Sequence, residues 1–209
     1  MGNLFRPDSP LMRFMMLITN LIALNVLWLI GCLGVVTAGA STVAMHSVLI
    51  SYIKGKDDAV LKPFLKAFKD NFRIATPLWL LNLLIGAVMA AELIYLSVDG
   101  QLWLKIIFGV LLFVYAAATA YLYPLLARYQ TTRRAALFNS FALSMRHLLS
   151  SLCVVTLNAL PVVLAVWFGE IFWKTVLVWS LMGFSLIAYL SVKILLPVFQ
   201  KYEKSDEEA

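Results

Sequence analysis

Residues 14–35 read FMMLITNLIALNVLWLIGCLGV, a run of 22 residues without a single charge. A hydrocarbon core of about 30 Å is crossed by about 20 helical residues, so this run is long enough to span a bilayer. Four further, largely apolar runs cover residues 74–96, 102–126, 148–168 and 171–196. Lipid offers no hydrogen bonds to bare backbone, and none of the runs alternates as a barrel strand does. The sequence therefore predicts an all-α protein, a polytopic helical membrane bundle.

Composition supports a single membrane domain over residues 1–209. Hydrophobic residues make up 62% of the 209 residues, and the spans with their connections leave no room for a soluble domain. The net charge of +6 comes from basic residues at the ends of the apolar runs, where they set topology and meet anionic lipid. We therefore expect the lipid bilayer, including anionic lipids, as a partner and expect no nucleic-acid binding.

Residues 37–53, TAGASTVAMHSVLISYI, decide the number of spans. Seventeen helical residues reach about 25 Å, so this segment could cross the membrane, re-enter it or lie at its surface. If the segment crosses, 15 of the 17 Lys and Arg residues lie on one side, and only Lys105 and Lys174 lie on the other. If it does not cross, Arg6 and Arg13 change sides and the division becomes 13 to 4. The positive-inside rule favours crossing.

We thus predict six transmembrane helices, the second one short, arranged as three hairpins with both termini cytoplasmic. The alternative is five spans plus an interfacial helix. Either arrangement makes the chain a multi-pass membrane protein.

An amphipathic stretch lies between the second and third predicted spans. Phe64, Phe68 and Phe72 recur every four residues, and basic residues including Lys69 and Arg73 occupy the other side. A helix of this kind lies in the headgroup plane with its aromatic face down. We predict an interfacial helix over residues 61–73, with the three phenyl rings buried in lipid or against the bundle. The alternative is a docking face for a cytoplasmic partner, with Asn71 between the aromatic and basic residues.

Enzymatic motifs are not found in the sequence. It contains no H-E-x-x-H, no G-x-x-x-x-G-K-[ST] and no G-x-S-x-G, and neither Cys32 nor Cys153 has a C-x-x-C partner. We expect no catalytic residues, no metal and no cofactor.

Four polar residues fall at membrane depth and are the candidate site residues: Asn25, His46, Asn82 and Asn158. Intramembrane polar residues are functional candidates by default. They also hold bundles together through hydrogen bonds between helices. We expect His46 to face the bundle interior on one stripe with Gly39 and Thr42, bonded to a neighbouring helix and not to a metal.

Several segments resemble the YesL family of uncharacterised bacterial integral membrane proteins. They are Asp8-x-Pro10 with Arg13, then LNVLW at 24–28, VVTAGAS at 35–41, FLKAFKDNF at 64–72, YPLLARY at 123–129 and PVFQKY at 197–202. One departure is Gly34, where the family often has a proline; both residue types break a helix at an outer turn. The resemblance implies no established activity and no catalytic residue to carry over.

Members of that family are commonly encoded beside carbohydrate-uptake transporters and glycoside hydrolases. The resemblance therefore implies a non-enzymatic accessory role in sugar import, such as at an ABC importer, or in its regulation. Partners would be a transporter permease or a second copy of the chain. The rival hypothesis is a small transporter or channel, which would need Asn25, His46, Asn82 and Asn158 to converge on one cavity.

The topology can be tested with single cysteines at residues 3 and 206. Since both termini are predicted inside, both cysteines should be protected from an impermeant thiol reagent in intact cells. Labelling of residue 3 alone would instead support the five-span arrangement.

Overall fold

The computed structural model describes residues 9–56, 59–99 and 101–207, and this part of the chain is helical without any strand. The elements in chain order are α1 (Pro10–Cys32), the 3₁₀ turn η1 (Val35–Thr37), α2 (Ala38–Ile53), α3 (Leu61–Asp99), α4 (Leu102–Arg128), α5 (Arg133–Arg146), α6 (Leu148–Trp167), α7 (Gly169–Val178), the π-helical turn η2 (Trp179–Gly183) and α8 (Phe184–Glu207).

Six segments of the described chain are long and apolar enough to cross a membrane. They are Pro10–Cys32, Val35–Ile53, Leu61–Leu96, Leu102–Arg128, Leu148–Trp167 and Gly169–Glu203. The predicted all-α class is confirmed, and the short stretch at residues 37–53 does form a helix of spanning length together with η1. A multi-pass membrane protein is the class that these helices indicate.

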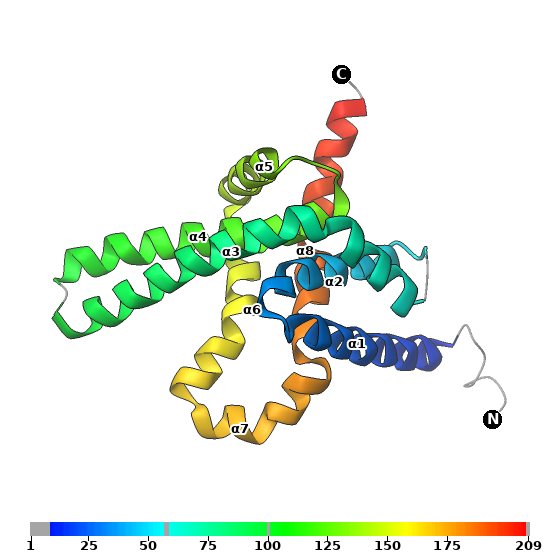
Figure 1. Cartoon of the computed structure of the whole chain (residues 1–209), viewed down its shortest axis with the longest axis horizontal. Coiled ribbons are helices and arrows are strands. Elements are labelled where there is room, and N and C mark those ends of the chain that lie inside the picture. Colours follow the sequence, from blue (N-terminus) through cyan, green and yellow to red (C-terminus); the bar gives the residue numbers. More distant parts are fainter. Residues whose placement is uncertain (1–8, 57–58, 100, 208–209) are drawn as a thin grey trace.

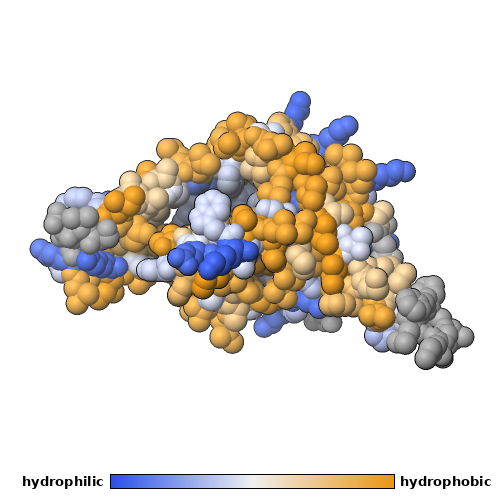
Figure 2. Space-filling view, turned by 90° about the horizontal axis from the view of Figure 1, so that it is seen from below, coloured by the Kyte–Doolittle hydropathy of each residue, from blue (hydrophilic) through white to orange (hydrophobic). Residues whose placement is uncertain are grey.

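Figure 1 shows how the helices are arranged. The α3–α4 hairpin forms one long arm, and α6, α7 and α8 form a second arm that leaves the centre in another direction. Helix α2 lies where the arms meet, and α1 runs from there toward the N-terminus at the right of the view. Figure 2 shows a face that is mostly apolar, with hydrophilic residues concentrated in a few patches, as expected for a surface that meets lipid.

The short helix α2 forms the centre of the bundle. Eleven of its 16 residues are buried, and it packs against α1, α3, α4 and α8. Ala40 and Val43 belong to a core cluster with Tyr121 and Phe199, whereas Met45 and Leu49 belong to a second cluster on the side of α1. One helix therefore contributes to both cores, because its small residues let several neighbours approach closely.

Gly39 marks the closest of these approaches. A Cβ atom built there would lie 2.8 Å from the carbonyl oxygen of Ala75 and would also collide with the Cβ of Trp79. The indole of Trp79 in turn donates a hydrogen bond of 2.7 Å to the carbonyl of Val35, which ties α3 to the turn before α2.

The prediction of a separate interfacial helix over residues 61–73 is wrong. This segment is the first part of the 39-residue helix α3, which continues into the third span. Phe64 is only 3% exposed and joins the core cluster of Leu21 and Leu49, while Phe72 remains exposed. Phe64, Phe68 and Phe72 do follow one face of the helix, but other parts of the protein cover most of that face.

Pro77 interrupts the backbone ladder of α3 because proline has no N–H to donate to the carbonyl four residues earlier. That carbonyl belongs to Arg73, and the Nη2 atom of Arg133 donates a hydrogen bond of 2.7 Å to it. The sequence placed Arg73 on a basic interfacial face; the structure shows that its backbone also anchors α5 to α3.

Replacing Gly39 with Ala should lower the free energy of unfolding by about 1–3 kcal/mol, because the added methyl group has no space between α2 and α3. Gly109→Ala is the matched control, since a Cβ atom there meets nothing within 4 Å. It should be neutral or stabilise by up to about 1 kcal/mol. Fluorescence-detected gel filtration after heating measures both, and equal melting temperatures would contradict the assigned packing.

Candidate functional site

Asn25 supports a break in the last span. Its side chain is fully buried on α1, and its Nδ2 atom donates to the carbonyls of Trp179 at 3.2 Å and Ser180 at 2.7 Å. Its Oδ1 atom accepts a hydrogen bond of 2.9 Å from the backbone N–H of Ser185. One amide thereby satisfies three backbone groups at the π-helical turn η2, and such turns are frequent at functional sites.

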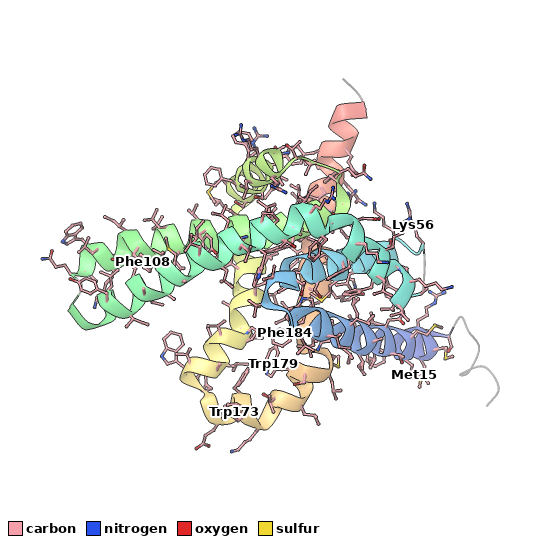
Figure 3. All side chains as sticks on the ribbon, viewed as in Figure 1. Met15, Lys56, Phe108, Trp173, Trp179 and Phe184 are labelled. Carbon is pink, nitrogen blue, oxygen red and sulfur yellow. The ribbon has the colours of Figure 1, made fainter. Side chains whose placement is uncertain are left out.

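Neighbouring side chains complete this contact between α1 and η2. The hydroxyl of Ser185 donates to the carbonyl of Leu21 at 2.8 Å. The ring of Phe184 lies 5.1 Å from that of Trp28 and 5.9 Å from that of Trp179, measured between centroids. Figure 3 labels Trp179 and Phe184 at the junction of the second arm with α1. Polar and aromatic contacts together fix the turn against α1.

His46 is buried on α2, as predicted, but its bonding differs from the prediction. Its Nδ1 atom lies 2.8 Å from the carbonyl oxygen of Thr42, one turn earlier in the same helix, and not on a neighbouring helix. The carbonyl four residues earlier is within reach of a side chain inside a helix, so this hydrogen bond requires no second helix. The bond to α1 is made by Thr42, whose Oγ1 accepts from the indole of Trp28 at 3.1 Å.

Asn82 and Asn158 join other pairs of helices. Asn82 is buried on α3 and donates to the hydroxyl of Tyr123 at 3.2 Å, while its backbone carbonyl accepts from Tyr115 at 2.8 Å, both on α4. Asn158 on α6 donates to the hydroxyl of Ser191 on α8 at 3.2 Å and to the carbonyl of Val154 in its own helix at 2.8 Å.

The structure therefore does not bring the four intramembrane candidates together. Asn25 joins α1 to η2, Asn82 joins α3 to α4, Asn158 joins α6 to α8, and His46 bonds within α2. Each asparagine thus joins a different pair of elements, as the structural role of such residues requires, whereas the hydrogen bond of His46 joins no two helices.

A cavity of about 780 Å³ opens at the end of the bundle where α2 ends, α3 begins and α4 ends; we call this end the basic end and the cavity the basic-end cleft. Its lining mixes charged, amide and hydroxyl groups with a few apolar ones, from Ser47, Pro63, Lys66, Ala67, Asp70, Asn71, Ile74, Leu126, Ala127, Arg128, Tyr129, Gln130, Thr131 and Thr132. The residues at 129–131 also line a second cavity of about 460 Å³, between α5 and α8.

Arg128 holds α4 to α8 at this end. Its side chain is 4% exposed, and its Nε atom donates to Oε1 of Glu203 at 2.8 Å while its Nη2 atom pairs with Oε2. The guanidinium also lies 5.6 Å from the ring centre of Tyr129 and 5.9 Å from that of Phe199. Such a two-point pair fixes geometry well. Its Nη1 atom is buried without a hydrogen-bond partner among the described residues.

Two titratable groups beside the Arg128–Glu203 pair have shifted pKa values. Burial, with the neighbouring Glu203 carboxylate, raises the pKa of Tyr129 to about 12. Burial and then the positive charge of Arg128 lower the pKa of Lys54. At neutral pH the Tyr129 hydroxyl is thus protonated, and its hydrogen bond goes to the Glu203 carboxylate.

The sequence analysis did not single out Arg128 and Glu203 as site residues. Three of the segments that resemble the YesL family meet at this end, and their meeting was the sequence signal that could have indicated the site. Residues 64–72 and 123–129 line the basic-end cleft, and residues 197–202 bring Phe199 against Arg128. Of the predicted docking residues, Asn71 lines the cleft, Lys69, Phe72 and Arg73 are exposed, and Phe64 and Phe68 pack into the bundle.

Residues 21–93 match the model of a family described as "Protein of unknown function, DUF624". The chain is 27% identical over 208 residues to the uncharacterized protein YteU of Bacillus subtilis (strain 168), a match covering 95% of this chain and 89% of that protein. No solved structure matches. The family match includes Asn25, all of α2 and the part of α3 that lines the cleft.

Asn25→Leu should lower the melting temperature of the purified protein and speed hydrogen exchange at the amide of Ser185. The apolar side chain leaves the carbonyls of η2 and this N–H without their partner, at about 1–3 kcal/mol for a group left unsatisfied. Asn20→Leu is the matched control, because it makes the same exchange on α1 outside this contact. If the two variants behave alike, the role assigned to Asn25 fails.

Proposed function

We propose that this chain is a non-enzymatic accessory protein of the bacterial cytoplasmic membrane, and that it docks on the permease of a carbohydrate importer through the basic-end cleft. The observation that carries the proposal is the placement of its polar groups. The amides at membrane depth bond helices to one another, whereas the open basic-end cleft presents charged, amide and hydroxyl side chains.

Charge supports a cytoplasmic position for the basic end. Lys54, Lys66 and Arg128 lie at this end, while Lys105 and Lys174 lie near the opposite ends of their hairpins. Basic residues accumulate on the cytoplasmic side of a membrane protein. A cleft on this side is accessible to the cytoplasmic loops and helices of a neighbouring transporter.

The lining of the cleft suits a protein segment. Gln130, Asn71 and the hydroxyls of Thr131 and Thr132 can each donate and accept hydrogen bonds, which is what an exposed peptide backbone requires. Lys66 and Asp70 supply one charge of each sign. Sugar import itself is the role implied by the family resemblance, an associational argument.

Photocrosslinking in native membranes tests the proposal. A benzophenone amino acid at Lys66 and at Gln130 should give adducts with an integral subunit of a carbohydrate importer, identified by mass spectrometry. The same amino acid at Trp173, which is 72% exposed at the far end of the second arm, is the control and should not give them. Adducts only between two copies of the chain, or none above the control, would overturn the proposal.

The second candidate is a small transporter or channel, and one observation favours it. The last span is interrupted by η2, and transporter spans are often broken at their binding sites. Flux of ions and sugars across proteoliposomes distinguishes the two candidates. The accessory role predicts no flux above that of empty vesicles, and flux abolished by Asn25→Leu but retained in Asn20→Leu would establish the transporter.

A further inference from the structure

Helix α5 (Arg133–Arg146) has three distinct sides. One packs against α4 through the small buried residues Ala136, Ser140 and Ser144. A second lines the 460 Å³ cavity through Asn139, Ala142, Leu143 and Arg146, with Phe138 at its edge. The third, which we call the open side, carries Arg134, Leu137 and Phe141, and Phe138 lies on its border with the cavity. Phe138 is 71% exposed and Phe141 47%, so large apolar groups are left uncovered.

The chain holds this open side near the bilayer surface. With 14 residues, α5 is too short to span, and it lies outside the six candidate spans. Four residues link it to the end of α4, and only His147 separates it from α6. Four extended residues reach at most about 14 Å, so α5 stays at the level where two spans leave the membrane. Figure 1 shows it nearly end-on beside the α3–α4 arm, which runs across the view.

The charge of α5 has one sign. Its sequence, RRAALFNSFALSMR, has Arg133 and Arg134 in the first turn and Arg146 in the last, and no acidic residue. Two arginines at a helix N-terminus oppose the helix dipole, so their positions are unfavourable for the isolated helix. A neighbouring anionic surface attracts these arginines and so offsets their unfavourable interaction with the helix dipole.

We propose that the open side of α5 docks on the anionic headgroups of the leaflet in which α4 ends and α6 begins. Phe138 and Phe141 insert below the headgroups, and Arg134 binds lipid phosphates. The bilayer is the occupant because two spans hold the helix against it, and because exposed aromatic and basic residues on one short helix are typical of interfacial binding. This inference is independent of the docking partner proposed above.

Depth measurements by electron paramagnetic resonance test the proposal on the whole protein. Spin labels are placed at Phe138→Cys or Phe141→Cys after replacement of Cys32 and Cys153, in vesicles of phosphatidylcholine with or without phosphatidylglycerol. Leu84→Cys, 64% exposed in the middle of α3, gives the lipid reference, and Lys56→Cys gives the aqueous one. Labels on α5 should be open to oxygen and protected from a nickel chelate, more strongly when phosphatidylglycerol is present.

Removing charge should weaken the lipid preference. Arg134→Gln should reduce the phosphatidylglycerol-dependent gain in depth by at least about half, since a basic residue near the surface contributes to the attraction. Lys62→Gln with Lys69→Gln removes two charges from α3 and should leave the gain unchanged. Nickel access at residue 138 equal to that at residue 56 would overturn the proposal, as would exclusion of both probes, which would show that protein covers this side. A depth independent of phosphatidylglycerol would overturn the anionic preference.

Discussion

Lipid cannot satisfy a polar group, and this constraint accounts for the arrangement of the whole bundle. The amide of Asn25 serves three backbone groups at the π-helical turn, so α1 and the last span must pack together. Asn82 imposes the same requirement on α3 and α4. Helix α2 is shielded from lipid in another way. The small residues along it allow α1, α3, α4 and α8 to pack closely around it. The shortest spanning helix is therefore the most buried.

The basic end of the bundle also carries polar side chains, but these line a cavity. Once the amides at membrane depth have been assigned to helix junctions, a cavity with charged, amide and hydroxyl side chains is left beside Arg128, where α3, α4 and the link to α5 meet. The pair of Arg128 with Glu203 fixes α8 at this end, and the aromatic rings of Tyr129 and Phe199 surround the guanidinium. The apolar arms then anchor the chain in lipid, and the basic end offers the surface on which another molecule can bind.

Hydropathy predicted the spans because each needs only length and apolar composition, and charge bias predicted α2 as a span. The pattern of Phe64, Phe68 and Phe72 left open whether lipid or protein covers these rings, because helical spacing shows only that one face is apolar. The partners of Asn25 could not be predicted, since they lie more than 150 residues away in a turn without a sequence signal. Helix α5 was missed because its small residues and arginines give little hydropathy contrast.

Hydroxyl-radical footprinting of the unmodified protein in nanodiscs tests the central claim, that polar residues at membrane depth hold helices together and do not line a water-filled path. The account predicts rapid modification of Tyr129 and Tyr202 at the basic end, and no modification of Met45, His46 or Tyr121 above the level of other buried side chains. Modification of His46 and Tyr121 at rates comparable to that of Tyr129 would show water along the bundle interior and would contradict the account.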